Sequence, residues 1–167
     1  ANENGQPGLF IADLTDASVT REALSTLDPT RDAARVTFKD APVRRLGAAG
    51  EGFALLEQVT DRAAVLLAFE QCGGADRCLE MAKAYALERY AFGRVIASYQ
   101  AIKHKLADMY VKNELARSNA YYGAWALNTN APELPVAASA ARIAASEAFW
   151  FGAKENIQTH GGIGFTW

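Results

Sequence analysis

Residues 99–123 read YQAIKHKLADMYVKNELARSNAYYG, and this stretch decides the fold. A stripe of mostly apolar or small residues recurs in it at alternating steps of three and four: Tyr99, Ile102, Leu106, Met109, Asn113, Ala116, Ala120 and Gly123. Charged residues fill the gaps, so a helix here would have one apolar face and a charged back. The pattern predicts about thirty helical residues, roughly 45 Å, a length typical of helical bundles.

A second helix is predicted on the C-terminal side. Residues 128–135 break the chain with Asn, Thr and two prolines, and Pro135 suits the first turn of a following helix. From there to about Gln158 the sequence is rich in Ala and apolar on almost every side. Because small residues let helices approach closely, we expect this helix to lie centrally, surrounded by neighbours.

The sequence before the stripe changes character near Gly47. Residues 50–90 are typical of a long helix, with a kink or break expected at the Gly73-Gly74 pair. Earlier, residues 9–12 and 35–39 show strand patterns, with Val36 and Phe38 on one half-buried face. Since two or three strands do not make a stable sheet, residues 1–48 are interpreted as the remnant of a larger β domain.

The predicted fold class is therefore mainly α. It consists of an antiparallel, up-and-down helical bundle over residues 49–167, preceded by a partial β domain. The chain stops at Trp167 just after a Gly-rich turn, where a further bundle helix is expected, so we interpret the sequence as a fragment.

Composition narrows the function classes. The 167 residues carry a net charge of −2 with scattered basic residues, which argues against nucleic-acid binding. The longest apolar runs fall well short of the ~20 residues that cross a bilayer, so no membrane partner is expected. Residues 1–8 are polar and resemble no signal peptide, which predicts a cytoplasmic protein.

Cysteine and histidine supply no further chemistry. Cys72 and Cys78 are six residues apart and would point to separate helix faces, so they are expected to be free thiols in a reducing compartment. With only His104 and His160 available, we expect no metal site.

The first motif that could carry chemistry is Glu88-Arg89-Tyr90-Ala91-Phe92-Gly93, followed by Gln100. An arginine can pair with phosphate in a fixed fork, and a phenylalanine can cover a flat ring. The alternative is a helix C-terminus in which Arg89 favours the dipole, Gly93 caps the helix and Phe92 belongs to the core.

The second motif is Gln158-Thr159-His160-Gly161-Gly162-Ile163-Gly164-Phe165. Its glycines permit left-handed backbone angles and close approach of a ligand, and bare N–H groups can cradle an anion. The alternative is a plain helix-ending loop, and His160 by itself is interpreted as a loop or packing residue rather than a base.

Taken together, the ordered motifs resemble the C-terminal domain of the acyl-CoA dehydrogenases. They comprise Glu88-Arg89-x-x-Phe92-Gly93, Gln100-Ala101-Ile102, Leu106-Ala107-Asp108-Met109, Ala116-Arg117 and the Gln158-to-Phe165 loop. The resemblance runs from about Gly50 to the end. It extends weakly upstream, where residues 36–40 resemble the last strands of the family's middle β domain.

The resemblance implies a cofactor and partners. Arg89, Phe92 and Gln100 would contact the FAD of a neighbouring subunit, and Gln158, Gly161 and Gly162 would line its pyrophosphate and adenosine end. The parent would desaturate acyl-CoA thioesters, pass electrons to an electron-transfer flavoprotein and form a homotetramer, a dimer of dimers.

Departures from the family leave alternatives open. The family's usual catalytic glutamate lies beyond Trp167, so the catalytic base is expected outside this chain and the fragment inactive by itself. Some members place the glutamate near the position of Ala63, and many carry an arginine at that of Ala64, three residues after Asp61. The alternatives are a non-catalytic subunit of a heteromeric dehydrogenase, a same-fold flavin oxidase or monooxygenase, and a helical assembly module without cofactor.

Overall fold

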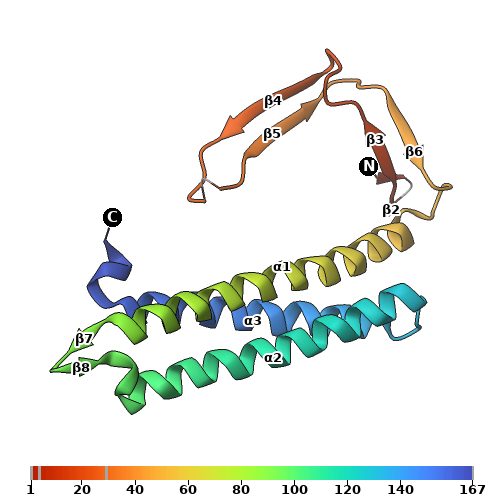
Figure 1. The fold of residues 1–167 in the computed structure, drawn as a ribbon. Coiled ribbons are helices and arrows are strands. Elements are labelled where there is room, and N and C mark those ends of the chain that lie inside the picture. The colour runs from red at the N-terminus through yellow and green to blue at the C-terminus, as the bar shows by residue number, and fades with distance from the viewer. Residues whose placement is uncertain (1, 4, 29, 167) are drawn as a thin grey trace. The chain divides into compact units, whose positions relative to one another are not determined.

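A computed structural model describes residues 2–3, 5–28 and 30–166 of the chain (Figure 1). The chain divides into two compact units, Ala1–Gln58 and Val59–Trp167. The last strand of the first unit ends at Leu46 and the first helix begins at Gly52, so strands give way to helices where the composition changes. The domain limits 1–48 and 49–167 stay a prediction.

The first unit consists of antiparallel strand pairs. β1 (Asn2–Glu3) pairs with β2 (Gln6–Pro7), β3 (Leu9–Ala12) with β6 (Val43–Leu46), and β4 (Val19–Leu24) with β5 (Ala33–Phe38). The strands predicted at residues 9–12 and 35–39 are thus present as β3 and β5, whereas β4 and β6 were not predicted. Val36 and Phe38 are exposed rather than half-buried; within the described residues of the first unit, β5 pairs with β4 alone.

Three long helices form most of the described part of the second unit. They are α1 (Gly52–Glu88), whose first residues belong to the first unit, α2 (Gln100–Thr129) and α3 (Leu134–His160). α2 has 30 residues and buries Met109, Asn113, Ala116, Ala120 and Gly123 from the predicted stripe, which confirms that prediction. Pro135 stands in the first turn of α3, also as predicted.

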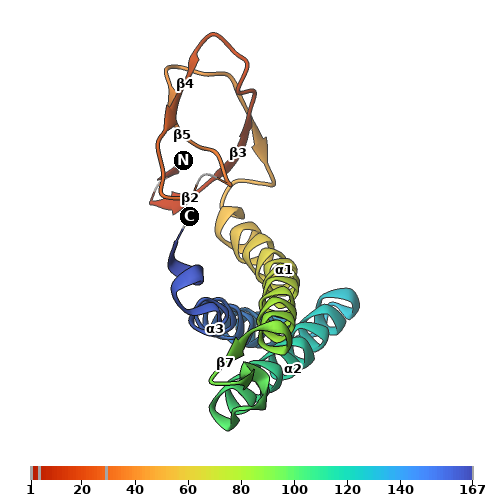
Figure 2. The same ribbon diagram turned by 60° about the vertical axis from the view of Figure 1, so that its left-hand side comes forward.

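The helices run up, down and up. Along α1, Phe69 contacts Tyr121 and Asp76 contacts Arg117 of α2. Along α2, Lys105 contacts Glu155 and Lys112 contacts Phe151 of α3. In both pairs the residue numbers run in opposite directions, so consecutive helices are antiparallel (Figures 1 and 2). Gln71 of α1 hydrogen-bonds to Ser146 of α3, and further along both helices Tyr85 stacks on His160. α1 and α3 are therefore parallel and end at the same end of the bundle.

Small residues form the core between the three helices. Its buried cluster contains Ala68, Cys72 and Ala75 from α1, Ala116 and Ala120 from α2, and Ala141, Ala145 and Ala148 from α3. Such side chains bring the helix axes close, and a Cβ added at Gly123 would lie 3.2 Å from Val65 Cγ2. Both cysteines are free thiols; burial raises their pKa values.

The break expected at Gly73-Gly74 is wrong, because α1 is continuous from Gly52 to Glu88. Gly74 faces α3, where an added Cβ would lie 2.7 Å from Cε2 of Phe149. The Phe149 ring occupies the space that a side chain at position 74 would need, which explains why this position holds a glycine. It also offsets the cost of about 1 kcal/mol that a glycine brings to a helix interior.

The expectation that α3 is surrounded by neighbours is also wrong for the described residues. One face of α3 is buried against α1 and α2, but Val136, Ile143, Trp150 and Ile157 are exposed. They recur every seven residues on the opposite side of the helix, which explains why the sequence is apolar almost all round. Within the part of the chain that the structure describes, no helix is both long and apolar enough to cross a bilayer.

Candidate functional site

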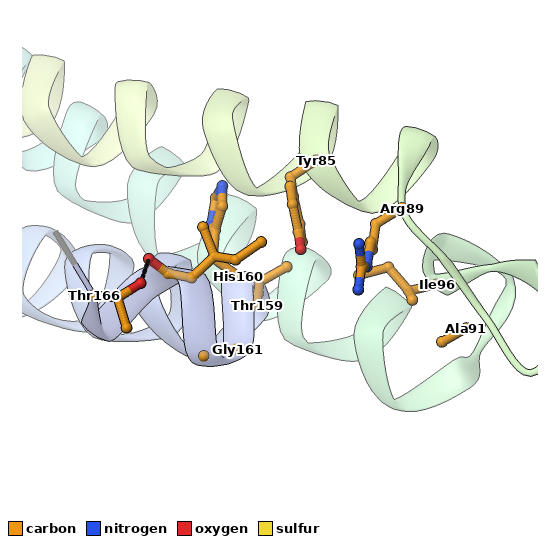
Figure 3. Close-up of a pocket in the computed structure, with 10 residues that line it drawn as sticks. Tyr85, Arg89, Ala91, Ile96, Thr159, His160, Gly161 and Thr166 are labelled. Atoms are coloured by element: carbon orange, nitrogen blue, oxygen red, sulfur yellow. Dashed lines mark hydrogen bonds between the residues drawn. The ribbon is translucent and has the colours of Figure 1, made fainter.

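A cavity of about 510 Å³ lies where α1 and α3 end (Figure 3). Residues from both helix ends and from the segments that follow them form its wall: Tyr85, Arg89, Ala91, Ile96, Thr159, His160, Gly161, Gly162, Ile163 and Thr166. The volume is in the range of small-molecule sites, about 300–1,000 Å³.

Arg89 is held at the cavity by its backbone. Its N–H donates to the carbonyl of Tyr85 at 2.9 Å, and its own carbonyl accepts from the N–H of Ile96 at 2.8 Å. The guanidinium points from the end of α1 into the cavity, beside Tyr85 (Figure 3). Among the described residues it has no ion-pair partner, so this cation remains available to a ligand.

A tight hairpin follows Arg89. β7 (Tyr90–Ala91) pairs with β8 (Arg94–Val95) through a turn in which Phe92 has φ 52° and Gly93 has φ 80°. Two positive φ angles are typical of a type I′ turn, but a phenylalanine pays a steric cost there. Phe92 is also 97% exposed, so the alternative in which it belongs to the core and Gly93 caps the helix is wrong.

Tyr99 contacts both strands of this hairpin. Its hydroxyl donates to the carbonyl of Ala91 at 2.9 Å, and the Arg94 guanidinium carbon lies 4.0 Å from the centre of its ring. The η1 segment (Ile96–Ser98) then leads into α2, whose first residue is Gln100. The Gln100 amide lies 3.2 Å from Nε2 of His104 and is exposed.

The glycine-rich loop closes the cavity from α3 as the short η2 helix (Gly161–Phe165). Gly161 has φ 61° and ψ −136°, a backbone conformation that residues with a side chain rarely adopt. Gly164 packs tightly, since an added Cβ would lie 2.5 Å from the carbonyl oxygen of Ile157. The backbone thus requires glycine at positions 161 and 164. Gly161 and Gly162 present no side chain to the cavity that they line.

Tyr85 and His160 join the two helix ends. Their rings stack with centroids 4.3 Å apart and planes at 26°, and Nδ1 of His160 lies 2.8 Å from the carbonyl oxygen of Asn156 (Figure 3 shows the two rings). This stack fixes the distance between Arg89, one turn beyond Tyr85, and the glycine loop that begins after His160.

The cavity brings together three of the predicted site residues, Arg89, Gly161 and Gly162. Phe92, Gln100 and Gln158 do not line it and are exposed. Sequence reasoning missed Tyr85 as a wall residue and gave His160 no role in a site. The spacing of Tyr85 and Arg89, one helical turn apart, was the signal that could have placed Tyr85 on the same face.

Comparison with known proteins identifies the class to which this arrangement belongs. Residues 50–167 match the family model for the acyl-CoA dehydrogenase C-terminal domain. The chain therefore belongs to the acyl-CoA dehydrogenase family, whose members in general are FAD-dependent oxidoreductases. The family resemblance and the mainly α fold predicted from the sequence are confirmed.

Individual relatives match over most of the chain. Acyl-CoA dehydrogenase IpdE2 of Mycobacterium tuberculosis is 39% identical over 170 residues, which cover 98% of this chain and 49% of the relative. Butyryl-CoA dehydrogenase from Megasphaera elsdenii is similar in structure with a TM-score of 0.90 and 27% identity, over 95% of this chain and 43% of that one. A variant of the Tcur3481-Tcur3483 steroid ACAD gives a TM-score of 0.87 and 30% identity, over 98% and 44%.

The chain thus spans about half the length of these relatives.

Proposed function

We propose that this chain supplies part of the FAD site and an oligomer interface of an FAD-dependent acyl-CoA dehydrogenase. The observation that carries the proposal is the cavity that joins Arg89 to the bare backbone of Gly161 and Gly162. These residues lie in two separate motifs of the sequence, and the fold brings both to one wall of a ligand-sized space.

The residues of the cavity fit the phosphate end of FAD. An unpaired guanidinium can bind phosphate oxygens in a fork, and glycines, which carry no side chain, let an anion approach the backbone closely. The N–H of Gly161 itself donates to the carbonyl of Gln158. At about 510 Å³ the cavity would hold only part of so large a cofactor, so the remainder must lie on other residues. When bound, the FAD of such an enzyme accepts the hydride that leaves the β carbon of an acyl-CoA.

Phe92 is proposed to cover FAD beyond the cavity. A strained and almost fully exposed phenylalanine is costly both to the backbone and to solvation, which is typical of a residue kept for a ligand or partner contact. Gln100 and Gln158 are proposed as further amide contacts, one at the start of α2 and one near the end of α3.

The remaining assignments rest on the family alone. The FAD is proposed to belong to a neighbouring subunit of a homotetramer, with acyl-CoA as substrate and an electron-transfer flavoprotein as acceptor. The catalytic base is proposed to lie outside these 167 residues. On α1, the two positions where family members carry a glutamate or an arginine hold Ala63 and Ala64, neither of which can move a proton or bind a carboxylate.

That pair of alanines favours a second candidate, a non-catalytic subunit of a heteromeric dehydrogenase. Such a subunit would keep the FAD-contacting end of the bundle and leave the chemistry to its partner. The two candidates differ in the residue that follows the glycine-rich loop at the family's glutamate position, where a non-acidic residue would favour the second.

The test is FAD retention by an Arg89→Ala variant of the intact protein. Loss of one charged hydrogen bond is expected to weaken binding by about 1.5–3 kcal/mol, measured by flavin fluorescence on dilution. Lys83→Ala is the matched control, because Lys83 is an exposed cation on α1 outside the cavity, and its FAD affinity should not change. Equal FAD affinity in wild type and Arg89→Ala would contradict the assignment.

A further inference from the structure

The cavity lies at an unfavourable place for an anion. α1 and α3 both present their C-terminal ends to it, and a helix C-terminus carries about half a negative charge. Arg89 offsets one of these ends. The last turn of α3 also contains a basic residue, His160, which lines the same cavity and has no role in the function proposed above.

The hydrogen bonding of His160 fixes its tautomer. A backbone carbonyl only accepts, so Nδ1 of His160 must carry the proton shared with Asn156 O at 2.8 Å. In the neutral ring Nε2 therefore has a lone pair and cannot donate to a phosphate. Protonation at Nε2 turns the ring into a donor at both nitrogens without breaking the bond to Asn156.

The ring is also held in place by Tyr85, which stacks on it at 4.3 Å. The titratable or charged groups that line the cavity with His160 are Tyr85 of α1 and Arg89, which follows α1, and no carboxylate lines it among the described residues. On α3 itself, Glu155 is engaged by Lys105 at 2.7 Å. No side chain described in the cavity wall therefore carries a negative charge, whereas a bound phosphate would place one beside His160.

We infer that His160 is a second, proton-linked cation of this cavity, which takes up one proton from solvent at Nε2 when the phosphate group of a ligand binds. The inference rests on the proposed function for the identity of the ligand as FAD. It adds that the affinity for FAD falls as the pH rises through the range in which histidine titrates. FAD itself supplies no proton, because a pyrophosphate diester stays doubly charged across that range.

The experiment measures FAD affinity of the intact protein between pH 5.5 and pH 8. Affinity is expected to fall about tenfold, near the lower end of the range for a hydrogen bond to a charged group. Calorimetry in buffers of different ionisation enthalpy should show uptake of up to about half a proton, the amount that linkage gives for a tenfold change in affinity. His160→Phe keeps an aromatic ring on Tyr85, and His160→Gln keeps a donor for Asn156; neither can be protonated. Both are expected to bind FAD more weakly at pH 5.5 and with little pH dependence.

One control variant and two contradicting outcomes separate this role from a structural one. In His104→Gln, which removes the only other histidine of the chain, the pH dependence should persist. If His160→Phe and His160→Gln fold normally and keep the wild-type pH profile, His160 only packs and the inference is overturned. The same result follows if FAD binds to wild type with no pH dependence, although the proposed function would then stand.

A second probe does not depend on FAD. Sulfate stays doubly charged over this pH range, so a proton-linked site should bind it more tightly at pH 5.5, with a shift of the His160 ring signals in NMR spectra. Proton-linked sulfate binding without FAD binding would support the inference and contradict the proposed function. No response of His160 to either anion would overturn the inference.

Discussion

The strand region and the helical region of this chain bury their side chains very differently. Five of the six residues in β4 and in β5, and all four of β6, are exposed. In the helices, by contrast, the core alanines of α1, α2 and α3 are almost completely buried. The strands form backbone hydrogen bonds in pairs but bury few side chains. The helices form their own backbone hydrogen bonds and also bury apolar side chains against one another in a core.

The difference indicates where the stability of the described chain resides. Burial of apolar surface is the dominant favourable contribution to folding, and the strand pairs supply little of it. Substitutions should therefore affect stability strongly between the helices and weakly in the strand region.

The largest effect is expected for Ala141→Leu. Ala141 is fully buried in the cluster of small residues between the three helices, so a leucine there would overfill the core. Unfolding in urea, followed by circular dichroism, should show a loss of about 3 kcal/mol, the upper end of the cost of overpacking. Ser139→Leu, at an exposed position of the same helix, should change stability by less than about 0.5 kcal/mol. Similar losses in both variants would mean that the alanine core is not tightly packed.

A smaller effect is expected for Asp76→Asn. Arg117 donates to both oxygens of Asp76 at 2.8 Å, a contact that raises the pKa of Arg117 and links α2 to α1. Both side chains are about one-third exposed, so solvent screening limits the loss to about 1–2 kcal/mol. Glu80→Gln, which breaks the exposed pair with Arg77, is the control and should cost close to nothing. Equal costs for the two pairs would contradict a special role for the bidentate one.

The two neighbouring glycines of α1 should respond in opposite directions. Gly73 has open space around it, so Gly73→Ala should stabilise the helix by about 0.5–1 kcal/mol. Gly74→Ala would press on the Phe149 ring and should cost about 1 kcal/mol despite the better helix propensity. Thermal unfolding of both variants measures the difference, and a stabilised Gly74→Ala would show that the ring can move aside.

The same glycines show how far the sequence could predict this fold. Periodicity in residues 99–123 was sufficient to place α2 and its buried face, because an apolar stripe repeats over about seven turns. The glycine pair was misread as a break, since the compensating contact with Phe149 comes from a residue far along the chain. The exposed stripe of α3 was misread as buried for a related reason: composition reports that a face is apolar but not what covers it.

The candidate site was predictable in its motifs and not in its geometry. Arg89 and the glycines were singled out as residue types that suit phosphate, and the fold places them in one cavity. The stack of Tyr85 on His160 joins two helices that are parallel only because α2 intervenes, and no local pattern reports such a pairing. Phe92 was weighed as a core residue, since hydrophobicity alone does not reveal a type I′ turn that turns its ring to solvent.

The smallest expected effect returns to the strand region and concerns acid. Asp16, in the turn before β4, accepts hydrogen bonds from the Ser18 hydroxyl and N–H, which lower the pKa of its carboxyl below the ordinary value of 3.8. A pKa lowered in the folded state stabilises the turn above that ordinary value and ceases to do so as the pH falls through the lowered one. Carbon-detected NMR titration should therefore show a midpoint for Asp16 below pH 3.8. The contacts among the alanines of the helix core should persist, because alanine side chains do not titrate. Ser18→Ala removes the largest contribution, so the midpoint should move up toward 3.8; an unmoved midpoint would show that the turn does not hold the carboxylate.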